Sequence, residues 1–235
     1  MKIAVVNFSG NVGKTTTTVQ LLAPRLPSYR LVTLETSNTG SVLIDARKID
    51  AKRFEDVFEE IIVNEKIILD IGSSNIEATF SGLVAWEGLH HDIAFYIVPC
   101  TADDKIQTDT YRTIERLAEH GVKPQRIRIV LNRVTGTTPE EILREFKILS
   151  DFATLTKLCV VDAALAIPES PLFDSLEEIG IPLSAVLNLD EKKLRDDIAA
   201  NGPEKPTALK MLSIQMRGKA MLKTLDGVFA ALKLK

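Results

Sequence analysis

Apolar residues follow two alternating patterns along the first two thirds of the chain. Short runs rich in β-branched residues predict strands, whereas apolar residues at intervals of three and four over 54–62 and 106–117 predict amphipathic helices. This alternation is typical of βαβ units that feed a mostly parallel sheet. The expected strands cover residues 2–7, 30–34, 66–70, 93–99, 126–132 and, more weakly, 158–161.

These elements predict an α/β fold with a twisted, mostly parallel sheet and helices on both faces. At 235 residues, of which 45% are apolar, the chain is long enough to bury one complete core without a second domain. We expect one domain over residues 1–200 and a C-terminal basic helix over 207–235. Pro203 and Pro206 mark the expected linker between them.

Composition narrows the cellular setting. Cys100 and Cys159 form no C-x-x-C pair and no histidines cluster at ligand spacing, so neither a disulfide framework nor a zinc site is indicated. The first residues lack a signal-peptide pattern and no apolar run of about 18 residues is free of charge, so we expect a soluble cytoplasmic protein. The net charge of −3 divides into +5 over residues 207–235 and −8 over the rest, which favours an anionic partner for the C-terminal segment.

Residues 5–16, VVNFSGNVGKTT, run from an apolar strand through a glycine-containing loop into a helix start. In a phosphate-binding loop (P-loop), backbone N–H groups and the helix dipole bind a polyphosphate, a lysine adds a charge and a hydroxyl binds Mg²⁺. The pattern G-x-x-x-x-G-K-[ST] lacks its first glycine because Phe8 stands there. Gly10 and Gly13 still leave the backbone unhindered. The predicted nucleotide-binding residues of this P-loop are Ser9, Gly10, Asn11, Val12, Gly13, Lys14, Thr15 and Thr16.

Two carboxylates follow expected strands. Asp70 is predicted at the carboxyl end of a buried strand beside the P-loop, where it can hold Mg²⁺ together with Thr15. Glu35 follows the second strand and either orients attacking water or accepts hydrogen bonds from the next helix start; Asp45 is an alternative acid. The predicted catalytic set is Lys14, Glu35 and Asp70. Residues 72–75, GSSN, form either a loop that senses a γ-phosphate or an ordinary polar loop.

Asn132, Arg133 and Pro168 follow later strands, at the edge of the sheet where a nucleotide base is expected. An asparagine amide presents one donor and one acceptor, which suits the edge of a purine. The guanine-reading pattern N-K-x-D is not met, because Thr135 occupies its acid position. Adenine is therefore favoured, although each of these residues could equally belong to loop structure.

With these residues, the chain resembles the ParA/MinD group of P-loop ATPases over most of residues 1–185, and its N-terminal stretch is similar to StbB-type plasmid stability and transfer proteins. The family loop reads N-x-K-G-G-x-G-K-T-T, and this chain has NFSGNVGKTT from Asn7. Ser9 replaces the signature lysine that reaches across a nucleotide-sandwich dimer, and Asn11 replaces a glycine. The resemblance implies that Asp70 is the Walker B acid, that Glu35 lies near the acid of the D-x-D-P-Q segment, and that Asn132 and residues 167–169 frame adenine.

The resemblance also implies a switch that binds ATP or ADP with Mg²⁺, forms an ATP-dependent homodimer and serves plasmid stability, partition or conjugative transfer, with a plasmid-encoded DNA-binding adaptor as a partner. Loss of the lysine at position 9 implies slow hydrolysis, because a trans-acting cation can raise the rate on the order of 10³-fold. Arg133 and Lys105 are alternative cations. Two other functions stay open: an ATP-dependent small-molecule ligase or kinase like dethiobiotin synthetase, and a module that holds ATP without turning it over.

The C-terminal segment predicts an amphipathic basic helix. It is expected to bind anionic lipid or DNA phosphates, or to pack on its own domain. Gly218 and Gly227 weaken such a helix by about 1 kcal/mol each relative to alanine. The apolar positions of the expected stripe are Leu209, Leu212, Met216, Ala220, Leu225, Phe229 and Leu232, among Lys210, Arg217, Lys219, Lys223, Lys233 and Lys235.

Overall fold

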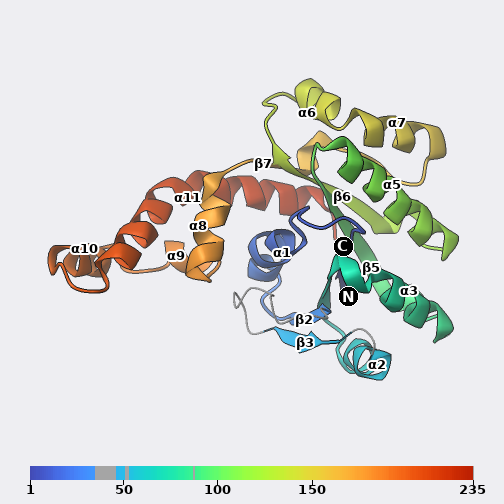
Figure 1. Ribbon diagram of the computed structural model, residues 1–235, viewed down its shortest axis with the longest axis horizontal. Helices are drawn as coiled ribbons and strands as arrows, with labels where there is room; N and C mark the ends of the chain where they lie inside the picture. The colour runs from blue at the N-terminus through green and yellow to red at the C-terminus, as the bar shows by residue number, and fades with distance from the viewer. Residues whose placement is uncertain (35–45, 51–52, 87, 235) are drawn as a thin grey trace.

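The computed structural model describes residues 1–34, 46–50, 53–86 and 88–234. Within them, seven parallel strands form one sheet in the order β3-β2-β4-β1-β5-β6-β7 (Figure 1). An all-parallel sheet needs helices on both faces, because the crossovers between its strands must cover it. The strands are β1 Lys2–Val5, β2 Arg30–Leu34, β3 Arg47–Ile49, β4 Ile67–Ile71, β5 Ile93–Cys100, β6 Ile127–Val134 and β7 Ala166–Pro168.

The helices divide between the two faces of the sheet. One face carries α2 Phe54–Val63, α3 Ile76–Ala85, α5 Asp104–Glu119 and α7 Lys147–Thr156. The other carries the helix that follows β1, together with α8 Pro171–Ile179, α9 Leu183–Leu187 and α11 Lys205–Ala231. The remaining helical segments are α4 Leu89–Asp92, α6 Pro139–Glu145, α10 Glu191–Ala199, and the short turns η3 Ser73–Asn75, η4 Pro124–Arg126 and η5 Ala163–Leu165.

Side chains of the central strand alternate between the two cores. Ile3 and Val5 of β1 face the α11 side, whereas Ala4 and the following Val6 face the α5 side. All four are fully buried, as expected when successive residues of a strand point to opposite faces of a doubly covered sheet. The P-loop thus follows the strand at the centre of the sheet.

The helix after the P-loop is not a uniform α-helix. It begins as α1 Lys14–Thr16, continues as a π-helix, η1 Thr17–Leu22, and ends as a 3₁₀ turn, η2 Ala23–Arg25. π-Helical segments are rare and are frequently found at functional sites. Pro24 lies in this 3₁₀ turn. The spacing of the apolar residues in this helix does not indicate π-helical hydrogen bonding.

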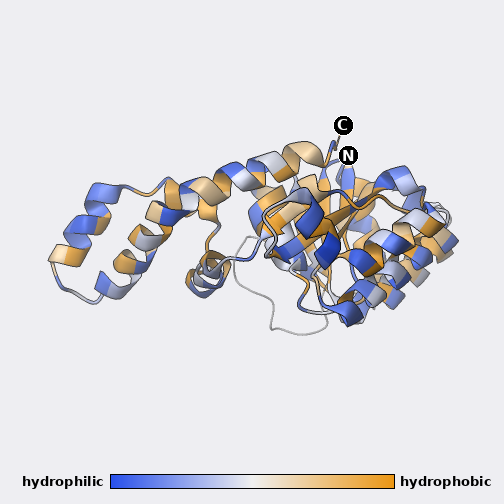
Figure 2. Ribbon diagram, turned by 90° about the horizontal axis from the view of Figure 1, so that it is seen from above, coloured by the Kyte–Doolittle hydropathy of each residue, from blue (hydrophilic) through white to orange (hydrophobic). Residues whose placement is uncertain are grey.

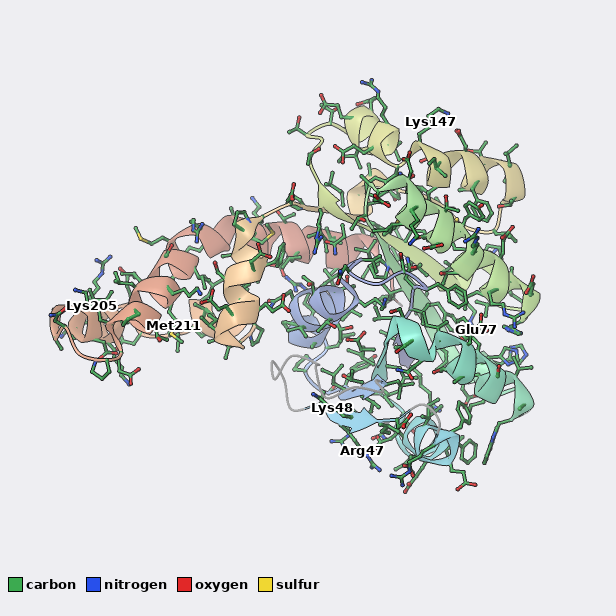
Figure 3. The ribbon with its side chains drawn as sticks, in the orientation of Figure 1. Arg47, Lys48, Glu77, Lys147, Lys205 and Met211 are labelled. Carbon is green, nitrogen blue, oxygen red and sulfur yellow. The ribbon has the colours of Figure 1, made fainter. Side chains whose placement is uncertain are left out.

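A helical arm extends away from the sheet. Figures 1 and 2 both show α10 and the first half of α11 projecting beyond the α/β layers, and Figure 3 shows Lys205 and Met211 on this arm. The second half of α11 packs on the sheet through Leu225 and Val228. Pro203 and Pro206 lie at the turn between α10 and α11 and in the first turn of α11.

The stripe expected on the C-terminal helix is partly wrong. Met216 is 73% exposed and Leu209 46%, and Ala220 is exposed as well. Leu225 and Leu232 of the expected stripe are buried. The other buried positions, which were not expected, include Ala208, Ile214, Gly218 and Val228. Figure 2 shows polar and apolar residues interleaved along the helix. The reason is that α11 packs against α9 and α10 within the arm. These two small surfaces determine which residues of α11 are buried there.

The sequence-based strand assignments differ from the structure in two further places. Residues 158–161 form no strand, and the seventh strand is β7, Ala166–Pro168. The three-residue β3 at the opposite edge was not expected. Both edge strands are too short to produce a recognisable alternating pattern.

Candidate functional site

The P-loop folds around the side chain of its lysine. Lys14 Nζ donates hydrogen bonds to the carbonyl oxygens of Asn7, at 3.0 Å, and Ser9, at 2.6 Å. Asn11 and Gly13 have φ angles of 55° and 83°, a left-handed conformation that turns the loop sharply before α1. The ammonium group is therefore held inside the turn of the loop, as a phosphate-binding lysine requires.

Asn7 ties the start of this loop to the sheet and to α5. Its side chain is fully buried, and its Nδ2 donates to the Pro99 carbonyl at 2.9 Å and to Thr110 Oγ1 at 2.7 Å. Its Oδ1 accepts from the backbone N–H of Ser9 at 2.8 Å. Thr113 Oγ1 in turn accepts from the N–H of Phe8 at 3.1 Å. Helix α5 thus sets the position at which the loop leaves β1.

A cavity of about 350 Å³ lies against the P-loop. It brings together the P-loop, the first turn of the following helix and the turn after β4. That last turn is far from the other two segments in the sequence. Its volume and its lining of backbone amides, hydroxyls and one lysine suit a polyphosphate. The lining residues are Gly10, Asn11, Gly13, Lys14, Thr15, Thr16, Gly72, Ser73, Ser74, Arg133 and Glu177.

A larger cavity of about 730 Å³ adjoins the first. The two share Gly13, Thr16, Arg133 and Glu177. The larger one includes both Asn132 and Pro168, so the structure brings these predicted base-site residues together beside the P-loop. The rest of its lining is Val134, Thr135, Gly136, Thr137, Glu169, Ser170, Pro171, Phe173 and Asp174.

The amide of Asn132 contacts the P-loop directly. Asn132 is 4% exposed, and its Nδ2 donates to the Val12 carbonyl at 3.0 Å. Its Oδ1 accepts from the backbone N–H of Arg133 at 3.2 Å. One donor and one acceptor of the amide are therefore engaged within the chain. The reading of adenine by this residue stays a prediction.

Asp70 lies near the carboxyl end of β4, the strand next to β1. Its Cα is paired in the parallel register with that of Val5, the last residue of β1, so Asp70 lies level with the end of that strand. The carboxylate is 4% exposed. After it, the N–H of Gly72 and Nδ2 of Asn75 both donate to the Leu34 carbonyl, at 3.0 and 3.1 Å. The 72–75 turn is thereby attached to the end of β2.

Several predicted residues lie elsewhere. Ser9 Oγ donates to Asp109 Oδ2 on α5, at 3.3 Å, and the Val12 side chain is buried in the protein. Lys105 is exposed in the first turn of α5 and does not line either cavity. Glu35 and Asp45 fall outside the described residues.

A helix was expected over residues 170–180, and α8 confirms it, but its contribution to the site was not predicted. Helix α8 presents Phe173, Asp174 and Glu177 to the larger cavity, and Glu177 also borders the P-loop cavity. A signal was available, because these residues recur at intervals of three and four on one face of a helix that follows Pro168 directly. Two of these three residues are acidic, whereas another face of the helix buries Leu172 and Leu176.

The residues present fit a nucleotide with Mg²⁺. A Cβ atom on Gly13 would come within 1.9 Å of Asn132 Nδ2, so only glycine lets the P-loop lie this close to the end of β6. The described residues contain no group of three or more His, Cys, Asp or Glu side chains that could hold a metal ion by themselves. Mg²⁺ in such sites takes one or two protein ligands and completes its shell with phosphate oxygens and water. Thr15 lines the P-loop cavity, whereas Asp70 lines neither cavity, so the metal-binding role of both stays a prediction.

Comparison with solved structures agrees with the architecture. The fold is similar to McdA of Cyanothece in its ATP complex, with a TM-score of 0.53, 14% identity, and coverage of 100% of this chain and 97% of that one. It is similar to the MinD cell division protein of Aquifex aeolicus, with a TM-score of 0.52, 16% identity, and coverage of 92% and 97%. The third is a putative plasmid partition protein of Borrelia burgdorferi B31 bound to AMPPNP, with a TM-score of 0.51, 13% identity, and coverage of 92% and 98%.

No family model matches the sequence, and no curated relative matches it. The structural similarities therefore establish the fold, which is the P-loop NTPase fold of MinD and ParA proteins. The fold class expected from the sequence is confirmed.

No described helix has the length and apolar character needed to cross a membrane.

Proposed function

We propose that this protein binds ATP with Mg²⁺ and acts as a slowly hydrolysing molecular switch of the ParA/MinD type. The observation that carries the proposal is the pair of adjoining cavities at the carboxyl ends of the strands, one formed by the Lys14 loop and one framed by Asn132 and Pro168. In open parallel sheets, ligands bind at this edge, where successive strands are added on opposite sides. In this sheet β1 is the central strand, with β4 on one side and β5 on the other.

The loop would hold the triphosphate through its backbone N–H groups and Lys14. Thr15 and Asp70 would hold Mg²⁺, which neutralises charge on the phosphate oxygens when it is bound. Ser73 and Ser74 border the same cavity, and their turn is hydrogen-bonded to the end of β2. This turn is the element that would change its contacts when the terminal phosphate leaves.

We expect slow hydrolysis because Ser9 supplies no charge where the ParA/MinD loop has lysine. Its hydroxyl is directed to the Asp109 carboxylate. An arginine- or lysine-type cation at the transition state can be worth on the order of 10³-fold in rate. A site without it can still bind nucleotide, since the loop and Lys14 do not depend on a charge at position 9 to contact the phosphates.

Helix α8 offers a route from the nucleotide to the arm. One face of α8 borders both cavities through Glu177, and the other packs against α11, where Lys210 and Glu178 form an ion pair. A small displacement of α8 on nucleotide binding would therefore move the arm, which carries the exposed Met216 among basic residues. Small sliding movements of packed helices are one of the ways in which switches work.

The more specific role we propose is plasmid stability, partition or transfer, with an ATP-dependent homodimer, a DNA-binding adaptor, and contact of α11 with DNA or an anionic membrane. The proteins of similar fold include a putative plasmid partition protein and cell division proteins, which supports a role in positioning. The outward side of α11 bears Arg217, Lys219 and Lys223, which suits an anionic partner.

The test is calorimetric titration of the full chain with ATP and with ADP in the presence of Mg²⁺. We expect saturable binding by the wild type and by Lys105→Ala, which removes an exposed lysine outside both cavities, and loss of binding by Lys14→Ala. Sedimentation velocity with ATP should show a dimer that Lys14→Ala does not form. Absence of ATP binding by well-folded wild type contradicts the proposal, and turnover only with an added metabolite favours the ligase or kinase alternative.

A further inference from the structure

Arg133 occupies an irregular position at the end of β6. The pairing of β6 with β7 shifts between Leu131 and Val134, so that one extra residue is inserted in β6, and Arg133 has a φ of 54°. A bulge of this kind redirects side chains and is over-represented next to active sites. A left-handed conformation is uncommon for a residue other than glycine.

The conformation of Arg133 is held by Asn132. The Arg133 backbone N–H donates to Asn132 Oδ1 at 3.2 Å. Nδ2 of the same asparagine side chain donates to the Val12 carbonyl of the P-loop at 3.0 Å. The position of Arg133 is thus coupled to that of the P-loop by two hydrogen bonds through one buried side chain.

Arg133 also has a distinctive electrostatic environment. Among the described residues that line the two cavities, Lys14 and Arg133 are the cations and Glu169, Asp174 and Glu177 are the acids. Arg133 borders both cavities, and its side chain forms no ion pair with any described residue. A triphosphate placed over the P-loop would lie beside the Glu177 carboxylate, while Glu169 and Asp174 line the adjoining cavity. A second positive charge besides Lys14 would therefore favour its binding.

We propose that the Arg133 guanidinium binds phosphate oxygens of the nucleotide held by its own chain, and so provides in cis a second cation in a P-loop that has serine at position 9. This inference rests on the proposed ATP binding. The planar guanidinium suits bidentate contact with phosphate. Lys105 lacks this placement, because it lies outside both cavities.

The experiment measures ATP affinity with Mg²⁺ at low and high salt for the full-length wild type and four variants. Arg133→Ala and Arg133→Gln remove the charge but keep a Cβ atom, so they leave the left-handed residue in place; glycine would relax the backbone and confuse the result. Arg133→Lys keeps the charge. Arg144→Ala is the matched control, since Arg144 is exposed on α6 and outside both cavities.

We expect Arg133→Ala and Arg133→Gln to weaken ATP binding by roughly 10- to 100-fold at low salt, as loss of a charge-assisted hydrogen bond predicts. The difference from wild type should shrink at high salt, Arg133→Lys should recover part of the loss, and Arg144→Ala should match wild type. Unchanged ATP affinity in folded Arg133→Gln, while Lys14→Ala loses binding, overturns the role of Arg133 and leaves the proposed function intact. A loss of equal size at both salt concentrations also overturns it, because stacking on the base then explains the effect.

Discussion

A Cβ atom on Gly13 would lie 1.9 Å from Asn132 Nδ2, so the P-loop and the end of β6 fit together only because residue 13 lacks a side chain. The same asparagine nitrogen donates to the carbonyl of Val12, the residue just before Gly13. Two segments 119 positions apart in sequence are thereby fixed to each other at the centre of the candidate site. This contact lies where the two cavities adjoin, since Gly13 lines both of them.

Gly13→Ala should destabilise the protein and abolish ATP binding. The φ of 83° costs an alanine roughly 1–2 kcal/mol, and the clash with Asn132 adds roughly 1–3 kcal/mol of overpacking. Urea unfolding followed by circular dichroism gives the change in the free energy of unfolding, and titration with ATP gives the change in affinity.

A double-mutant cycle separates these two causes. In an Asn132→Ala background, Gly13→Ala should cost only the conformational part, because the obstructing amide is gone. Equal costs in the two backgrounds would show that the interlock of Gly13 and Asn132 contributes nothing to stability.

Two glycines in α11 should respond oppositely to alanine. At Gly227 a Cβ atom meets nothing within 4 Å, whereas at Gly218 it would lie 2.5 Å from Leu183 Cδ1 of α9. Gly227→Ala should stabilise the protein by up to about 1 kcal/mol through helix propensity. Gly218→Ala gains the same term but forces the buried Leu183 out of place, so we expect a net loss of roughly 1 kcal/mol. Thermal unfolding of the two variants compares them directly, and a higher melting temperature for both would show that α9 does not pack closely on α11.

Glu60 should be the carboxylate whose neutralisation costs most at the β2–β3 edge. It is 4% exposed, and its Oε1 accepts from Arg47 Nη1 at 2.5 Å while its Oε2 accepts from Asn64 Nδ2 at 3.0 Å. Glu60→Gln keeps the shape but leaves the arginine without its anion. We expect a loss of roughly 1.5–3 kcal/mol in the free energy of unfolding, because the arginine is half-exposed and water compensates in part. The exposed neighbour Glu59→Gln should change it by less than about 0.5 kcal/mol, and similar values for both would contradict the structure.

The sequence predicted the features that depend on local chemistry. The strand, loop and helix start around Lys14 could be read directly because each residue type serves its own local geometry, and the long buried strands β4, β5 and β6 were recognisable as apolar runs. The interlock of Gly13 with Asn132 could not be predicted, because it depends on two segments meeting in space. The same holds for Glu177, whose helix was expected but whose place beside the cavities depends on the packing of α8 on α11.

The two cysteines should resist thiol reagents in the folded protein. Burial raises the pKa of both Cys100 and Cys159 from 9.0 to about 12, and the thiolate is the reactive form. At pH 8 we expect no labelling by iodoacetamide without denaturant and labelling of both thiols in urea, as mass spectrometry would show.

The raised thiol pKa values also make stability depend on pH. The thiols of the unfolded chain ionise first, so the free energy of unfolding falls as the pH rises above about 9. Cys159 borders a surface cavity of about 330 Å³, whereas Cys100 lies in β5 at the centre of the sheet. In single-cysteine variants carrying Cys100→Ser or Cys159→Ser, Cys159 should therefore label at lower urea concentrations than Cys100, because local opening exposes it, and the reverse order would contradict this placement.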